Sequence, residues 1–191
     1  TCAMSAGCWP PSVRVRISMR SLMDRLVAAR IGQTTNFYRH GSGAAERRDR
    51  LAAYLHSRAA AGILLVGEAP GYRGARISGI PFTSERLLTG SGPAEATATI
   101  VHRVLAELGV EDDVLLWNVV PTHPGTETSN RAPTRREVFE GRVFAEDLAA
   151  GRQVLAVGRV AHAALGGRYV RHPSHGGAVA FTAALHALIA P

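Results

Sequence analysis

The sequence contains no lysine, and all 22 of its Lys and Arg residues are arginines. Lysine is the side chain that forms Schiff bases with carbonyl substrates and that completes a P-loop, so the composition excludes both kinds of site. Cysteine is nearly absent as well: Cys2 and Cys8 are the only two, and they cannot supply the four ligands of an iron–sulfur cluster. No apolar run approaches the roughly 20 residues that span a membrane, which argues against a membrane partner.

The composition that is present predicts one soluble domain. The 191 residues are 46% hydrophobic and 19% charged, which suffices for a single core. Residues 1–18 lack the long apolar segment of a signal peptide and predict a disordered or non-native leader, so the domain is expected over 19–191. The formal charge of +7 suits a polyanionic partner. We expect a monomer in the cytoplasm, associated with the nucleoid.

Short apolar runs alternate with segments of helical periodicity along the chain. Strands are expected at Ile63–Val66, within Val114–Val120 where the strand ends on Asn118, at Gln153–Val157, and from Tyr169 to His172-Pro173-Ser174. Helices are expected over Leu22–Ile31, Ala44–Ala60, Pro93–Leu108, Thr134–Ala149, Arg159–Leu165 and Ala178–Ile189. Thr134 and Glu137 have the spacing of a capping box. This alternation predicts an α/β fold, a three-layer α/β/α sandwich on a mostly parallel four-stranded sheet.

The stretch from Ile63 to Phe82, ILLVGEAPGYRGARISGIPF, is the most informative part of the chain. It is typical of a buried parallel strand that runs into a loop rich in glycine and proline. In open α/β sheets, ligands bind at the carboxyl ends of the strands. The loop therefore brings one carboxylate, Glu68, and one aromatic ring, Phe82, to the place where a ligand is expected.

Two further strands end on polar residues. The second apolar run ends on Asn118, which is followed by a proline-rich loop. The last short strand runs into His172-Pro173-Ser174 and a pair of glycines. Because the carboxyl ends of parallel strands meet at one edge of the sheet, these side chains are expected to share a site with Glu68 and Phe82.

These motifs, in this order, resemble those of the uracil-DNA glycosylase superfamily over roughly Ala60 to Pro191. The resemblance is closest to the thermophile-type branch, which carries GEAPG, a G-x-PF segment, Asn-Val-Val and His-Pro-Ser. Here these motifs begin at Gly67, Gly79, Asn118 and His172. That branch also holds a four-cysteine iron–sulfur cluster, and this chain departs from it there. The resemblance implies a uracil-DNA glycosylase-like fold. Because the chain has too few cysteines for the cluster, we expect no cofactor.

The resemblance also implies roles for the site residues. Phe82 would form the flat wall on which an extruded base stacks, and Asn118 would read uracil with one donor and one acceptor. His172 would donate to O2 of the base as negative charge develops there. The backbone of Gly67, Ala69 and Gly71 would line the base pocket.

The residue that activates water is the least obvious part of the resemblance. The best-known branch has an Asp where this chain has Ala69, so Glu68 is expected to orient the water or to stabilise the sugar cation. Gly71 stands where that branch uses a Tyr to exclude the methyl group of thymine. The resemblance therefore implies open space at C5 of the base.

The expected partner is DNA that contains uracil or another deaminated base. Candidate contacts to its phosphates are the basic and polar residues around the motifs. These are Arg73, Arg76, Arg131, Arg171, Ser174 and His175.

The favoured function is monofunctional hydrolysis of the N-glycosidic bond of uracil, or a related deaminated base, in base-excision repair. Three alternatives remain open. A nucleotide-binding α/β protein lacks support, because no G-x-G-x-x-G opens a helix after a strand. A metal hydrolase built on His123, His172 and His175 would lack clustered carboxylates and helical ligand spacing. A non-catalytic nucleic-acid-binding member of the same fold would explain the scarcity of carboxylates.

Overall fold

The structure, a computed structural model, describes residues 18–189. The two cysteines and almost all of the expected leader lie outside these residues. Ser18 is described, and its Oγ accepts a hydrogen bond of 3.2 Å from the backbone N–H of Ser21. Ser18 thereby caps the first helix, which begins at Met19, three residues earlier than expected.

Four strands form one parallel sheet in the order β2-β1-β3-β4. They are β1 (Ile63–Gly67), β2 (Val114–Asn118), β3 (Gln153–Val157) and β4 (Arg168–Val170). The mixed α/β architecture confirms the predicted fold class. Every strand pair is parallel, so the carboxyl ends of all four strands lie at one edge of the sheet.

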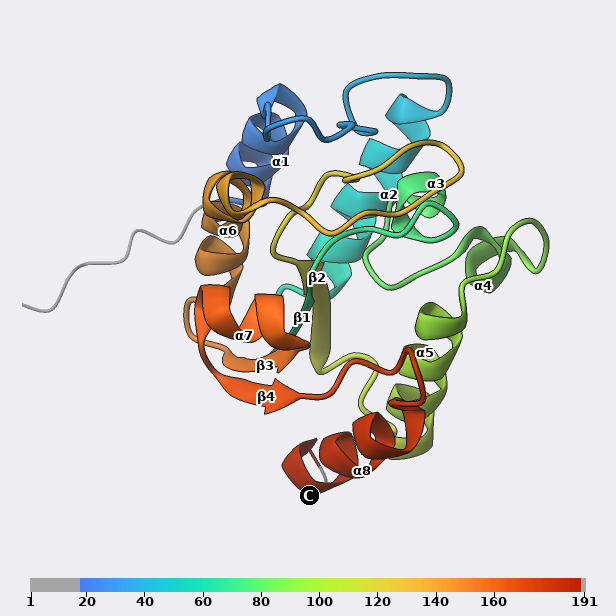
Figure 1. Ribbon diagram of the computed structural model, residues 1–191, viewed down its shortest axis with the longest axis vertical. Helices are drawn as coiled ribbons and strands as arrows, with labels where there is room; N and C mark the ends of the chain where they lie inside the picture. The colour runs from blue at the N-terminus through green and yellow to red at the C-terminus, as the bar shows by residue number, and fades with distance from the viewer. Residues whose placement is uncertain (1–17, 190–191) are drawn as a thin grey trace, which may run out of the picture.

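Eight helices connect and flank the described strands (Figure 1). They are α1 (Met19–Ala28), α2 (Ala44–Ser57), α3 (Ala75–Ser78), α4 (Glu85–Thr89), α5 (Ala96–Leu108), α6 (Arg135–Ala149), α7 (Arg159–Leu165) and α8 (Ala178–Ile189). The capping box is confirmed at the start of α6, where Thr134 and Glu137 bond each other's backbone N–H. The sequence did not predict α3 and α4, two short helices inside the glycine-rich segment.

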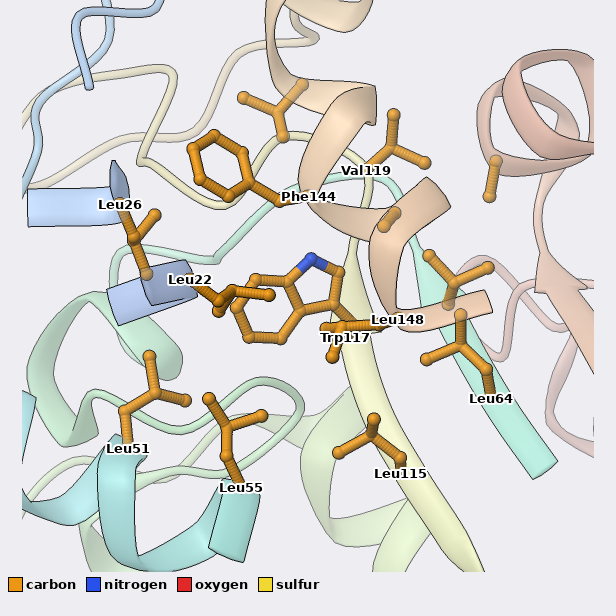
Figure 2. Packing of buried hydrophobic residues seen from close by; sticks show 14 of the residues in the cluster. Leu22, Leu26, Leu51, Leu55, Leu64, Leu115, Trp117, Val119, Phe144 and Leu148 are labelled. Carbon is orange, nitrogen blue, oxygen red and sulfur yellow. The ribbon is translucent and has the colours of Figure 1, made fainter. Parts of the chain in front are cut away.

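One face of the sheet is covered by α1, α2, α6 and α7. Trp117 of β2 is fully buried on this face, and aliphatic side chains of the neighbouring helices surround its indole (Figure 2). They include Leu22 and Leu26 of α1, Leu51 and Leu55 of α2, and Leu148 of α6. Burial of large apolar side chains of this kind stabilises a fold by about 1.5–3 kcal/mol each.

The other face of the sheet is covered by α5 and α8. Leu65 and Leu116 point to this face because side chains alternate along a strand, and they pack with Val104 and Phe181. In Figure 1, α5 and α8 lie together on the lower right, across the sheet from α1 and α6. The three layers of the expected sandwich are therefore present, and the carboxyl edge of the sheet is left to the loops.

Candidate functional site

A pocket of about 730 Å³ opens at the carboxyl edge of the sheet, and loops that follow all four strands line it. Most residues proposed from the sequence lie around it, namely Glu68, Ala69, Gly71, Phe82, Asn118, Arg131, Arg171, His172, Ser174 and His175. Gly67, Arg73 and Arg76 do not line it. A volume of this size is typical of small-molecule sites, and it accommodates one nucleobase with part of its sugar.

Phe82 forms an aromatic wall of the pocket and is also part of the hydrophobic core. Its backbone is left-handed, with φ at 52°, a conformation that costs a non-glycine residue about 1–3 kcal/mol. Gly67 lies directly against the ring, since a Cβ at that position would overlap Phe82 Cζ. The glycine therefore makes room for the ring, and the strained backbone holds the ring at the pocket.

Asn118 is the last residue of β2 and lies beside Gly67 in the neighbouring strand. Its side chain is buried, with only 4% of the residue exposed, and it lines the pocket. None of the side-chain hydrogen bonds within residues 18–189 involves its carboxamide, although buried amides normally have a partner. The amide is thus available to a ligand, with two donor hydrogens and one acceptor oxygen.

His172 is half-buried at the opposite side of the pocket, after β4. The backbone N–H of Ser174 donates to His172 Nδ1 at 3.1 Å, and Ser174 Oγ lies 2.7 Å from the same nitrogen. A ring nitrogen that accepts an N–H carries no hydrogen, so neutral His172 is protonated on Nε2. Burial, and then the neighbouring His175, lower the pKa of His172. At neutral pH the residue is therefore an uncharged donor.

Glu68 follows β1 directly and lines the pocket between the strands that carry Asn118 and His172. Its backbone oxygen accepts from Val120 N–H at 3.0 Å, which fixes the start of the loop. The carboxyl group has neither a hydrogen bond nor an ion pair to any residue of 18–189. Burial raises the pKa of Glu68, since desolvation disfavours its charged form. A carboxylate without a partner can take a proton from a bound water or stabilise a nearby positive charge.

The predicted phosphate-binding arginines differ in how strongly other protein groups already hold their guanidinium groups. Arg131 makes a two-pronged ion pair with Glu137, with N–O distances of 2.6 and 2.7 Å. Arg76 donates to the backbone oxygen of Glu127 at 2.9 Å, and Arg73 stacks over the ring of Tyr72. Arg171 is exposed at the pocket and donates only a long hydrogen bond, 3.4 Å, to the oxygen of His175. Arg171 is therefore the best placed of the four to meet a phosphate.

His123 is buried, and it does not join His172 and His175 in a metal site. Its Nδ1 lies 2.8 Å from the oxygen of Pro70, and its Nε2 lies 2.9 Å from the oxygen of Thr126. The ring thus ties the loop after β1 to the loop after β2. No three His, Cys, Asp or Glu side chains come together as a metal site within 18–189. The geometry gives no support to the metal-hydrolase alternative.

Two residues that sequence reasoning missed also line the pocket. Arg159 begins α7 just after β3, and it has no polar partner in the described part of the chain. The sequence could have indicated Arg159 only by its position just after the third strand, because none of the motifs includes it. Glu95 precedes α5, and its carboxylate lies against Gly71 and Gly74. The space expected beside Gly71 is therefore filled, because Glu95 occupies it, and only tertiary contact reveals this.

The chain is similar to known proteins in its sequence profile and in its fold. The sequence profile of the Uracil DNA glycosylase superfamily matches residues 56–189, which is most of the chain. The crystal structure of wild-type SMUG2 from Pedobacter heparinus superposes with a TM-score of 0.62. The similarity covers 89% of this chain and 97% of that one at 13% sequence identity, and it shows a shared fold alone. No curated protein sequence matches the chain. No helix within 18–189 is long and apolar enough to cross a membrane.

Proposed function

The chain belongs to the Uracil DNA glycosylase superfamily, and from that premise we propose that it hydrolyses the N-glycosidic bond of uracil, or of a related deaminated base, in DNA. The observation that carries the proposal is one pocket lined by an aromatic ring, a free buried carboxamide and a neutral histidine donor. These are Phe82, Asn118 and His172. A base turned out of the DNA stack needs each of them, one for its face and two for its edges.

The chemistry follows from where charge develops. As the C1′–N1 bond breaks, its electron pair moves to the base, and O2 and O4 become negative while the sugar becomes positive. The Nε2–H of His172 stabilises the charge at O2, and the amide of Asn118 meets O4 and N3–H. The oxygen of a water molecule then bonds to C1′, and the water's proton passes to the carboxylate of Glu68.

We also propose that the chain is related to the thermophile-type branch of the superfamily, without that branch's iron–sulfur cluster, and its motif residues support this. GEAPG begins at Gly67, the last residue of β1, and His-Pro-Ser begins at His172, two residues after the end of β4. A role in base-excision repair follows from the reaction, since removal of a deaminated base leaves an abasic site for repair. We propose that the protein acts as a monomer.

The direct test is excision from an end-labelled oligonucleotide with one uracil, offered single-stranded, opposite G and opposite A. We expect free uracil and an uncut abasic strand that breaks only after alkali, because the chain has no lysine for Schiff-base strand cleavage. Activity is expected to persist in EDTA. Glu68→Gln and His172→Gln should each reduce the rate about a hundred-fold or more. Tight binding of all three substrates without base release would identify a non-catalytic DNA-binding protein of the same fold.

Binding to DNA is expected to weaken steeply with salt, because a protein with formal charge +7 displaces counterions from the phosphates. Arg171→Ala should lower the slope of log Kd against log salt by about one, the change for one lost phosphate contact. Arg20→Ala on α1 is the matched control, since it removes the same charge away from the pocket. Equal slopes for wild type and Arg171→Ala, measured by fluorescence anisotropy, would leave Arg171 without a phosphate contact.

A further inference from the structure

We propose that the end of the pocket at β4 binds the nucleotide next to the extruded one, with its base stacked on Tyr169 and the phosphate that joins the two nucleotides held by Arg159. The inference rests on the proposed function and deepens it. It adds a second nucleotide subsite, and it makes a single-stranded segment of DNA the preferred form of the substrate.

The pocket extends across the whole carboxyl edge of the sheet. Strands β2 and β4 are the edges of the described sheet, and three strand spacings separate them by roughly 14 Å. Asn118 ends β2, and His172 Cβ lies 3.7 Å from the position of a Cβ added at Gly158, just after β3. The groups proposed to read the edges of the base therefore lie between β2 and β3. The pocket continues beyond them to β4, where it has room for a second group.

Tyr169 presents an aromatic ring at that end of the pocket. It is 44% exposed and lines the pocket, although large aromatic side chains are usually buried. Its neighbour Val170 is buried in the core on the α8 side, so Tyr169 points to the other face, where α7 lies beside β4 (Figure 1). There the ring of His162 meets it edge-on, at 76° and with centroids 5.7 Å apart. Tyr169 is therefore an oriented ring that is open to a ligand.

Arg159 and Arg171 place positive charge beside this ring. The last paired residues of β3 and β4 are Val157 and Val170, and both arginines follow within two residues of this pair. Their backbones therefore leave neighbouring strands at nearly the same level. Arg171 lies against Gly177 in the loop after His-Pro-Ser, whereas Arg159 has no bonding partner within residues 18–189. Arg159 is thus the arginine at this end that is available to a further phosphate.

The combination of charge and ring fits a nucleotide. The acidic residues that line the pocket, Glu68 and Glu95, belong to the loop after β1 and the segment before α5, so the end at β4 is positive. An aromatic face that accepts any base, next to a cation for the backbone, is how proteins bind single-stranded nucleic acid. The nucleotide next to the extruded one is covalently linked to it, so its effective concentration at this subsite is high. Its base can stack on Tyr169 only outside a duplex, which is why we infer a preference for single strands.

The experiment measures binding of single-stranded oligonucleotides by fluorescence anisotropy. Each carries one uracil on a 2′-fluoro sugar, because fluorine disfavours positive charge at C1′ and so slows base release. The neighbour on the 5′ side, on the 3′ side or on neither side is replaced by a tetrahydrofuran that lacks a base. Tyr169→Leu removes the ring but keeps an apolar side chain, and Tyr169→Phe keeps the ring. Phe139→Ala is the matched control, since it removes an exposed ring outside the pocket.

We expect loss of the base at one of the two neighbours to weaken binding by wild type about five-fold or more, the effect of one lost stacking contact. Tyr169→Leu should bind the complete strand more weakly by the same factor and should be insensitive to the missing base. Tyr169→Phe and Phe139→Ala should behave as wild type. Unchanged affinity of folded Tyr169→Leu, verified by circular dichroism, overturns the inference. Equal weakening on complete and base-free strands also overturns it, because the role of Tyr169 would then be structural.

Arg159 is tested with a neutral methylphosphonate in place of the phosphate between the uracil nucleotide and that neighbour. The replacement should weaken binding by wild type about three-fold or more and should leave the affinity of Arg159→Ala unchanged. Arg168→Ala is the matched control, since it removes an exposed arginine beside Tyr169 but outside the pocket. Equal sensitivity of wild type and Arg159→Ala overturns the phosphate contact. If wild type releases no uracil from the ordinary strand, the proposed function fails, and the binding measurements distinguish this outcome from failure of the subsite.

Discussion

Asn118→Asp is expected to reduce uracil excision by about a hundred-fold or more while leaving the protein folded. The amide of Asn118 is buried at the end of β2 and has no partner among the described residues, so its hydrogen bonds are available to the base. An ionised Asp has only acceptors, and it would face O4 of uracil with lone pair against lone pair. In a desolvated pocket that arrangement costs roughly 1–3 kcal/mol or more, in addition to the lost hydrogen bond.

The same substitution is expected to give weak activity on cytosine, whose amino group can donate to the carboxylate. Single-turnover assays on matched uracil and cytosine oligonucleotides measure both effects. Gln153→Glu is the matched control, because it exchanges an amide for a carboxylate on an exposed residue at the opposite end of the sheet. Uracil release at the wild-type rate by folded Asn118→Asp would show that Asn118 does not read the base.

Glu137→Gln is expected to lower the free energy of unfolding by about 2–3 kcal/mol, the largest stability effect that we predict. The Glu137 carboxylate is buried and accepts hydrogen bonds from Arg131 and from the backbone N–H of Thr134 and Gln33. It thereby joins α6, the loop after β2 and the loop before α2. Replacement by an amide would leave Arg131 without its counter-charge and would turn an acceptor into a donor that faces other donors.

The pH dependence gives this prediction a second measurement. Hydrogen bonds from Arg131, followed by those from Thr134 and Gln33, lower the pKa of Glu137 to about 2. A carboxyl group whose pKa is lowered by folding stabilises the protein above its unfolded pKa, near 4.5, and this stability is lost as the pH falls toward 2. The difference between wild type and Glu137→Gln in urea unfolding should therefore shrink over that range. Glu140→Gln is the control, because the ion pair of Glu140 with Arg136 is exposed and its loss should lower stability less than the loss of the buried pair. Equal effects of the two substitutions would contradict the assigned role of Glu137.

The sequence was sufficient to predict the elements whose apolar pattern is strong. Helices α7 and α8 have the bounds that the sequence predicts, and β2 ends on Asn118 as expected. The short helices α3 and α4 were missed, because four or five residues are too few for a helical period to show among glycines and prolines. Predicted helix starts were off by three residues at α1 and α5. At α1 the cap residue Ser18, rather than the apolar pattern, sets the boundary.

The site was predictable where a residue follows a strand, since parallel strands bring their carboxyl ends together. This is why the sequence predicts that Asn118, His172 and Glu68 lie around one pocket. Glu95 follows no strand, and it reaches the pocket only because the segment after Phe82 folds back on the loop after β1. The expectation of open space beside Gly71 was wrong for the same reason. Glu95, which is distant from Gly71 along the chain, fills the volume that a side chain at 71 would take.

Glu68 and Glu95 both line the pocket, and neither carboxyl group has a partner among residues 18–189. Each has a pKa raised by burial, so each favours folding only while it is protonated and ceases to do so as the pH rises through its folded pKa. At neutral pH both positions thus oppose the stability of the fold that carries them. Substitutions that raise heat resistance would therefore be expected at these two positions, and they would remove the two carboxyl groups that line the pocket.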